Sequence, residues 1–360
     1  MNHKICGYFF ALLFTLSIFW CGTSVAATSL PIYSVQIPVQ SMLETERNKA
    51  LPDALKTVLI RVSGDASVSQ NDQIAGMLNT PNRYVSEYSY QKAALGAAMP
   101  WILVVNFTPS AINQMLTQQK FSIWSKERPL ILVWLAIKNA KGTELVAGDS
   151  TDDAVILIKQ KAERRGLPIA FPLLDFSDMR HVNASDLWAQ SIDTVKQASE
   201  RYTPDEILMV DIDETNAAAI TAQWLLLSQD QKTPWTTDGA ALNDVIESGI
   251  NKVADALAQQ FVGASSTGQE NTVQLVVMNL QDVGDYAKVM QYLKGLSGVM
   301  QVSIENVSTS QVEFNLTLTT STQALQHTIQ LDKKLQPIQD QELGDQDGTV
   351  LKFRYQEGQS

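Results

Sequence analysis

The segment Leu130–Ile137 is an unbroken run of eight apolar residues, and it constrains the fold more than any other part of the sequence. A strand with one solvated face alternates apolar and polar residues, so a continuous run predicts a strand covered on both faces. Helical patterns follow it at Asp153–Arg165, Ser185–Tyr202 and Leu242–Phe261. The middle of the chain is therefore predicted to be an α/β domain.

The region before this run mixes strand and helix patterns. Strands are expected over Pro31–Val39, Tyr84–Leu95 and Ile102–Phe107, and a helix over Pro109–Gln119. A longer helix is expected from an apolar stripe between Ala50 and Val62, which ends at Gly64. Pro52 either kinks this helix or lies in its first turn. These patterns predict an N-terminal α+β domain over residues 28–140.

The α/β domain is expected to span residues 141–263. Between its helices, strands are predicted at Pro168–Leu174, Glu206–Asp213 and Ile220–Ser228, and a turn at Pro234–Gly239. Small polar residues follow the last helix and predict a linker over 264–271.

A compact pattern follows the linker. Its expected elements are the strand Thr272–Leu280, the helix Asp282–Leu296, the strands Val299–Val307 and Gln311–Thr319, and the helix Ser321–Leu335. This βαββα order is the core of a ferredoxin-like sandwich. We therefore expect a ferredoxin-like domain over 272–336 and an acidic tail over 337–360, in which Val350–Tyr355 could add a strand. The predicted class is a mixed α+β and α/β region followed by this small unit.

The first 27 residues have the organisation of a secretory signal peptide. Lys4 precedes the uncharged segment Ile5–Trp20, and small residues at Ser24 and Ala26 suit cleavage after Ala26 or Ala27. Trp20 before Cys21 disfavours a lipoprotein site, which needs a small residue there. An uncleaved N-terminal anchor is the alternative. Cleavage predicts a periplasmic protein with no transmembrane segment in the mature chain.

Composition excludes several functions. Both cysteines, Cys6 and Cys21, lie in the expected signal peptide, so a mature chain would have no thiolate chemistry and no disulfide. The 38 acidic residues outnumber the 27 basic ones, which disfavours nucleic acid because its binding depends on neutralising phosphates. No nucleotide-loop or metalloprotease motif is present. We expect no cofactor and no bound metal.

Several strings together resemble an uncharacterised bacterial envelope family, a domain of unknown function numbered 2066. They are Arg61-x-Ser63-Gly64-Asp65, Trp124-x-x-x-Arg128-Pro129 before Leu132-x-Trp134-Leu135, Trp224-x-Leu226 before Trp235-x-x-x-Gly239, and Asp285-Tyr286-Ala287 before Tyr292-Leu293, Leu296, Gly298-Val299 and Val302. The chain departs from the pattern around Glu206–Val210, where Pro204-Asp205 precedes and Asp211 follows. The resemblance implies an envelope location and brings no activity or ligand.

Asp211 and Asp213 are the best candidates for chemistry. They share one side of a predicted strand end, where paired carboxylates could bind a hard metal ion or act as acid and base in a glycosidase. Solvated charge at the end of a strand is the favoured interpretation, and Ile212 between them suits it. The histidines that would remain after cleavage, His181 and His327, lie in different predicted domains, so a histidine-based site would have to form between domains.

The candidate binding residues are aromatic or charged. Trp101, Trp124 and Trp235 lie beside predicted turns and are the better surface candidates among the tryptophans, although burial is commoner for this residue. Arg61, Asp65 and Arg128 would form either a shared polar site or an ion pair that holds the first helix to the sheet.

These patterns favour a non-enzymatic adaptor or assembly factor that contacts other envelope proteins. The alternative is a periplasmic hydrolase, or a protein that binds glycans or metal through Asp211 and Asp213. The sequence leaves the number of copies in the assembly open.

Overall fold

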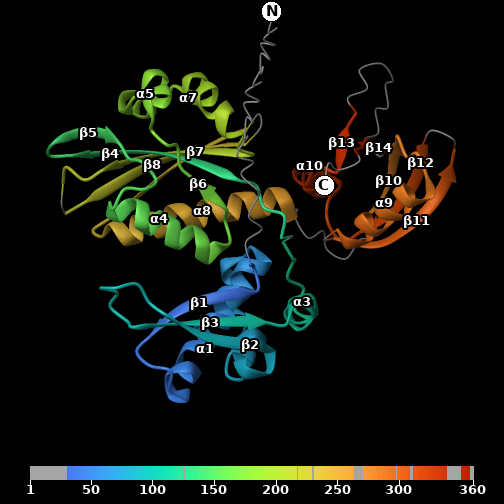
Figure 1. Ribbon diagram of the computed structural model, residues 1–360, viewed down its shortest axis with the longest axis horizontal. Coiled ribbons are helices and arrows are strands. Elements are labelled where there is room, and N and C mark those ends of the chain that lie inside the picture. Colours follow the sequence, from blue (N-terminus) through green and yellow to red (C-terminus); the bar gives the residue numbers. More distant parts are fainter. Residues whose placement is uncertain are drawn as a thin grey trace, which may run out of the picture.

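Three β-sheets and ten α-helices make up the part of the chain that the computed structural model describes: residues 31–124, 126–216, 218–228, 231–262, 271–296, 298–308, 311–338 and 350–356. Each sheet carries a hydrophobic core of its own. We call the three parts the first unit (31–124), the middle unit (126–262) and the C-terminal unit (271–356) (Figure 1). The expected signal peptide, the linker apart from Asn271, and residues 339–349 and 357–360 of the tail lie outside the described residues.

The first unit packs one long helix against a three-stranded antiparallel sheet. Its elements are β1 (Ser34–Val39), α1 (Glu44–Ser63), α2 (Asp72–Met77), β2 (Val85–Lys92), β3 (Trp101–Phe107) and α3 (Pro109–Gln118), and the strand order is β1-β3-β2. The apolar stripe of α1 is buried, so its prediction is confirmed. Pro52 lies inside α1 and not in its first turn. Gly64 ends the helix with φ of 74°, which glycine adopts without strain.

The middle unit is built around β4 (Ile131–Asn139), which is buried on both faces as its sequence predicts. The remaining elements are β5 (Gly142–Leu145), α4 (Asp153–Arg165), β6 (Ile169–Ala170), α5 (Phe176–His181), α6 (Ala184–Trp188), α7 (Ile192–Ser199), β7 (Glu206–Asp213), β8 (Ile220–Ser228), β9 (Gln231–Gly239) and α8 (Leu242–Val262). The strand order is β5-β4-β7-β8-β9, with β6 beside β4. Only β6 and β7 run parallel to β4; the other pairs are antiparallel.

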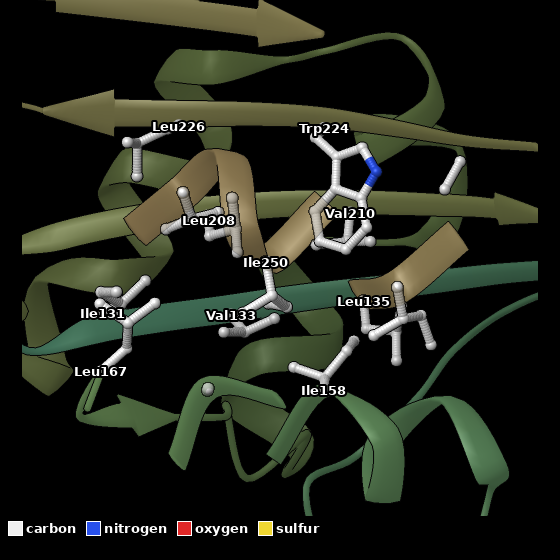
Figure 2. Packing of buried hydrophobic residues seen from close by; sticks show 14 of the residues in the cluster. Ile131, Val133, Leu135, Ile158, Leu167, Leu208, Val210, Trp224, Leu226 and Ile250 are labelled. Carbon is white, nitrogen blue, oxygen red and sulfur yellow. The ribbon is translucent and has the colours of Figure 1, made fainter. Parts of the chain in front are cut away.

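Helices cover both faces of this sheet. Helices α4 and α8 pack on one face over Ile131, Val133 and Leu135, with Trp224 of β8 in the same core (Figure 2). Helices α5, α6 and α7 lie over the opposite face (Figure 1). The hydrogen-bonded sheet thus groups β4 with the middle unit, whereas the expected boundary at residues 140 and 141 placed it in the first domain.

Two other expectations for the middle unit are wrong. Residues 234–239 were expected to form a turn, but they belong to β9, an edge strand that tolerates Pro234 on its unpaired side. The helix expected over 185–202 is divided into α6 and α7, because Gln190 between them has a left-handed φ of 51°.

The C-terminal unit has the expected β-α-β-β-α order. Its elements are β10 (Asn271–Met278), α9 (Val283–Gly295), β11 (Val299–Val307), β12 (Gln311–Leu318), α10 (Thr322–Asp332), β13 (Leu335–Pro337) and β14 (Val350–Tyr355), and the strand order is β11-β12-β10-β14-β13. Strand β14 runs parallel to β10. A ferredoxin-like sandwich has an antiparallel neighbour at that place, so a ferredoxin-like unit is not confirmed.

Candidate functional site at the junction of two units

Three buried arginines meet where the first unit contacts the middle unit. Arg61 lies in the last turn of α1, Arg165 ends α4, and Arg128 lies in the segment between α3 and β4. Their residues are only 5%, 4% and 9% exposed, in that order. We call these three residues the arginine junction.

Arg61 and Arg128 are held mainly by backbone oxygens. Nη1 of Arg61 donates to the carbonyl oxygen of Ser34 at 2.7 Å and to that of Pro31 at 3.3 Å. Nη2 of Arg128 donates to the carbonyl oxygen of Arg61 at 2.6 Å. Carbonyl oxygens at a helix end have no partner within the helix, so a guanidinium is well suited to satisfy them. The structure therefore brings Arg61 and Arg128 together, as the sequence suggested.

Arg165 crosses from the middle unit to the first. Its Nη2 donates to the carbonyl oxygen of Gly64 at 2.9 Å and to Oδ1 of Asp255 at 2.7 Å, and its Nη1 donates to Oδ1 of Asn251 at 2.7 Å. Asp255 and Asn251 both lie on α8. Arg165 thus ties the end of α1 to two helices of the middle unit. We missed it in the sequence, because a basic residue before Gly166 is already explained by capping of α4.

Trp124 lies inside the junction and not at the surface, being 1% exposed. Its peptide N–H donates to the carbonyl oxygen of Val62 at 2.8 Å, and the guanidinium of Arg128 lies 3.6 Å from the centroid of its ring. A cation over an aromatic face is attracted by the ring quadrupole, more so where water is excluded. Trp124 therefore contributes to packing, and its expected place at the surface is wrong.

Positive charges face one another in this junction. Burial holds the pKa of Arg128 well below its usual range, and the charges of Arg61 and Arg165 lower it further. Burial also lowers the pKa of Arg61. Such a cluster is held by surrounding structure, so its contacts fix geometry more than they add free energy.

Two cavities open beside the junction, on either side of a short 3-10 helix at Ala66–Gln70. The larger, of about 690 Å³, is lined by Ser63, Gly64, Asp65, Lys120, Asp255 and Gln259 among others. The smaller, of about 270 Å³, is lined by Lys56, Lys161, Arg164, Arg165 and Glu247 among others. Its cations are largely neutralised, since Lys161 pairs with Glu247 at 2.6 Å and Arg164 with Asp53 at 3.6 Å.

Asp65, which was grouped with Arg61 and Arg128 from the sequence, makes a local contact and does not join the two units. Its Oδ1 accepts a hydrogen bond of 2.7 Å from the peptide N–H of Ser67 and so caps the 3-10 helix. It also lines the larger cavity. The first helix is therefore tied to the middle unit through the arginines, and Asp65 has a local role.

Asp211 and Asp213 lie on the same face of β7 but in opposite environments. Asp211 is 2% exposed, its Oδ1 is buried without a hydrogen-bond partner among the described residues, and burial raises its pKa to about 7. Asp213 accepts hydrogen bonds from Thr215 and from Lys138 Nζ, the latter at 3.2 Å, and these lower its pKa. Solvated charge is thus the wrong interpretation of Asp211.

Separated pKa values are typical of an acid and base pair, but access to substrate is also required. Neither aspartate lines the two cavities beside the junction. In the described part of the chain, no three His, Cys, Asp or Glu side chains are arranged to hold a metal ion.

Glu206 is a second buried carboxyl group, at the other end of β7 and only 3% exposed. Its Oε1 accepts a hydrogen bond of 2.9 Å from the hydroxyl of Ser228, which also lies 2.9 Å from Oε1 of Gln260 on α8. Burial raises the pKa of Glu206 to about 8. This carboxyl group is therefore largely protonated at neutral pH and joins the sheet to α8.

Two other candidates are placed at contacts between aromatic rings. Trp235 on β9 is partly buried and stacks on Trp224, with ring centroids 6.0 Å apart and an interplanar angle of 4°. His327 on α10 packs edge-on against Phe261 of α8 with centroids 5.5 Å apart, and burial lowers its pKa. His327 thus contacts the middle unit and is only partly exposed.

A network that the sequence did not reveal fixes the start of α5. Arg201 donates to both carboxylate oxygens of Asp175 at 2.8 and 2.9 Å and to buried Asp178 at 3.1 Å, and the hydroxyl of Tyr202 donates to Asp178. Around this network the side chains of Leu173, Phe176 and Met179 are 70%, 74% and 62% exposed. We call these three residues the α5 patch.

The fold and the junction define a mixed α/β protein whose first unit is attached to the middle unit through buried arginine contacts. The profile of a family described as a domain of unknown function (DUF8605) matches residues 26–125. The matched segment thus covers the first unit and ends before β4. No curated protein matches the chain. These findings support an uncharacterised domain family in that segment. They do not show the family numbered 2066.

Proposed function

We propose that the protein is an exported, periplasmic and non-enzymatic adaptor or assembly factor, which acts through contacts with other envelope proteins. The observation that carries the proposal is the α5 patch. Three large apolar side chains lie exposed within seven residues, on a segment that the Arg201 network holds in place. Exposed apolar side chains grouped in this way are typical of protein contact sites.

The structural role of the arginine junction supports the same proposal. The arginine junction satisfies backbone carbonyls and fixes two units against each other, as a scaffold requires. Within the described residues, no helix combines the length and the apolar character needed to cross a membrane. The periplasmic location rests on the signal-peptide pattern of residues 1–27.

We also propose that the chain is related to the envelope family numbered 2066, whose strings it resembles over more of its length than residues 26–125. The C-terminal unit is then a variant of the ferredoxin-like sandwich in which the hairpin β13–β14 replaces the last strand. The strand order β11-β12-β10 and the two helices on one face support this interpretation.

The rival proposal is a hydrolase, or a protein that binds a glycan or a metal, acting through Asp211 and Asp213. Only the separated pKa values of these aspartates favour it. Burial of Asp211 and the ion pair of Asp213 with Lys138 weigh against it.

A complementation experiment separates the two proposals. In a strain that lacks the protein, we would express the double variant Asp211→Asn/Asp213→Asn, the double variant Phe176→Ser/Met179→Ser, and Leu95→Ser as a control at a fully exposed residue in the first unit. An adaptor predicts that only the Phe176/Met179 variant fails to restore the envelope phenotype and loses crosslinks from a photoreactive residue at position 173. Circular dichroism would check that each variant folds. A folded Asp211/Asp213 variant that fails to complement would reject the adaptor in favour of the enzyme.

A further inference from the structure

The larger of the two cavities beside the arginine junction has the size of a small-molecule site. Its volume is about 690 Å³, and ligand pockets typically span roughly 300 to 1,000 Å³. One wall comes from the first unit and the other from α8 of the middle unit. Ligand pockets occur preferentially at such boundaries between domains. We call it the junction cavity.

Polar side chains on both walls of the junction cavity are available to a ligand. Within the described part of the chain, the side chains of Gln70, Lys120 and Gln259 make no hydrogen bond or ion pair with the protein. Asp65 and Asp255 also line the cavity, and each uses only its Oδ1 in a hydrogen bond among the described residues. A molecule in the cavity can therefore bind to both units at once.

The charges around the junction cavity balance. The carboxylates of Asp65 and Asp255 are matched by the ammonium of Lys120 and by the guanidinium of Arg165, which donates to Oδ1 of Asp255 at 2.7 Å. The balance is local, because the whole chain carries a formal net charge of -11. A ligand with a net charge would leave that charge uncompensated where water is partly excluded. The cavity therefore favours an uncharged ligand.

The kinds of polar group narrow the chemistry further. Carboxylates only accept hydrogen bonds, a lysine only donates them, and the amides of Gln70 and Gln259 do both. A hydroxyl group both donates and accepts, so a ligand with several hydroxyl groups can satisfy all three kinds. Phe121 adds a partly exposed apolar side chain to the lining, against which the carbon-bound hydrogens of a sugar ring can pack.

The backbone at Lys120 adds a further observation. Lys120 has a left-handed φ of 60°. Its peptide N–H donates to the carbonyl oxygen of Thr117, and that of Phe121 to the carbonyl oxygen of Leu116, which together form a Schellman motif at the end of α3. Glycine is the usual residue at this position, because a side chain is strained there. Strained residues cluster at ligand sites, so the lysine suits a role in the cavity.

We propose that the junction cavity binds an uncharged saccharide, held by Asp65, Gln70 and Lys120 of the first unit and by Asp255 and Gln259 of α8. Because both walls contribute, the bound saccharide joins the two units and stabilises the folded protein. The inference goes beyond the proposed adaptor function and does not depend on the α5 patch. That patch lies over the opposite face of the middle sheet from α8 (Figure 1).

The first test is binding to the purified protein, measured by saturation-transfer NMR and by isothermal titration calorimetry. The uncharged probes are maltose, trehalose and N,N′-diacetylchitobiose, and the charged probes are citrate and spermidine. At least one saccharide should bind at millimolar concentration or below and should raise the midpoint of urea denaturation, whereas citrate and spermidine should not bind. Failure of every saccharide to bind, or binding of a charged probe alone, overturns the proposal.

Substitutions on each wall test the location of the site. Lys120→Gly removes the cation and relieves the left-handed strain, so it should raise the midpoint of urea denaturation while weakening saccharide binding. The dissociation constant should rise about ten-fold or more, as expected for the loss of one charge-assisted hydrogen bond. Gln259→Ala on α8 should also weaken binding.

Lys333→Gly is the matched control, because Lys333 ends α10 with φ of 57° and does not line the cavity. It should raise the denaturation midpoint in the same way as Lys120→Gly and leave the dissociation constant unaltered. Equal saccharide binding by Lys120→Gly and Lys333→Gly overturns the proposal, since the charge of Lys120 is then not used. Wild-type binding by Gln259→Ala also overturns it, because the second wall is then not part of the site.

Discussion

A Cβ atom at Gly166 would lie only 2.4 Å from Cγ of Arg61. The glycine ends α4 with φ of 68°, and the arginine stem packs against it from the last turn of α1. The Arg61 side chain therefore leaves no room for a side chain at position 166, and the two helix ends are closely packed.

Gly166→Ala should therefore lower the free energy of unfolding by about 3 kcal/mol, through left-handed strain and a clash with a buried side chain. The measurement is urea denaturation followed by circular dichroism. Gly76→Ala is the control, because nothing lies within 4 Å of a Cβ there in helix α2, and it should raise the free energy of unfolding by about 0.5 to 1 kcal/mol. Equal behaviour of the two variants would show that the junction is looser than described.

Arg165→Ala should cost more than Asp255→Ala, although the two residues form one ion pair of 2.7 Å. The arginine is buried and also donates to the carbonyl oxygen of Gly64 and to Oδ1 of Asn251, so its loss should cost about 3 kcal/mol. The side chain of Asp255 is 51% exposed, and its loss should cost about 1 kcal/mol or less. Denaturation of both variants in the same buffer tests the order. A larger effect of Asp255→Ala would mean that the ion pair, and not the backbone contact, holds the junction.

Asp211→Asn should stabilise the protein at alkaline pH and have little effect in acid. Burial raises the pKa of this carboxyl to about 7, above its value in an unfolded chain. The contribution of the protonated carboxyl to the free energy of unfolding is therefore fully present below about pH 4 and is lost as the pH rises through 7. At pH 8 the amide should raise the free energy of unfolding by about 2 to 4 kcal/mol.

Stability curves from pH 4 to 8 for the wild type, Asp211→Asn and Asp213→Asn provide the test. Asp213 has a lowered pKa, so its ionised form is the stabilising one, and Asp213→Asn should not gain stability as the pH rises. Glu206, with a pKa raised to about 8, keeps part of the pH dependence in every variant. Parallel curves for the wild type and Asp211→Asn would contradict the burial of Asp211.

Limited proteolysis should cut the chain first between residues 263 and 270. Small polar residues there lie between α8 and β10, which belong to different cores. Mass spectrometry should identify a stable fragment that begins near residue 271. Early cuts within 272–319 would argue against this boundary.

The mature protein should begin at Ala27 or Thr28. The pattern of Lys4, the apolar segment and the small residues before Ala27 is that of a cleaved signal peptide. The intact mass of protein recovered from the periplasmic fraction decides the question. A mass that includes residues 1–26, or a lipid adduct on Cys21, would contradict the proposed cleavage and release into the periplasm.

Local periodicity accounts for the elements that the sequence predicted well. The apolar stripes of α1 and α8 and the continuous run in β4 are set by residues near one another in the chain, and the structure confirms them. Proline was misleading at residue 234, because whether a proline is tolerated depends on which edge of the strand is paired, and that is decided by distant residues.

The arginine junction could not be derived from spacing. The three arginines come from segments far apart in the sequence. Their partners are mainly backbone carbonyl oxygens, which every residue has, so the sequence does not reveal them. Trp124 lies beside an expected turn and still becomes buried, because Arg128 and the end of α1 close over it. Arg61 and Arg128 were found because they belong to the strings that resemble the family numbered 2066, whereas Arg165 was found in the structure alone.

Strand β14 lies between β10 and β13 in the C-terminal sheet, although more than seventy residues separate its sequence from that of β10. Its Phe353 is part of the core that β10 begins. During synthesis, β10 must therefore wait with one side unpaired until residues 350–355 have left the ribosome. A premature stop before Val350 would remove an interior strand that pairs with β10, so such truncated chains should be cleared by proteases or aggregate through β10.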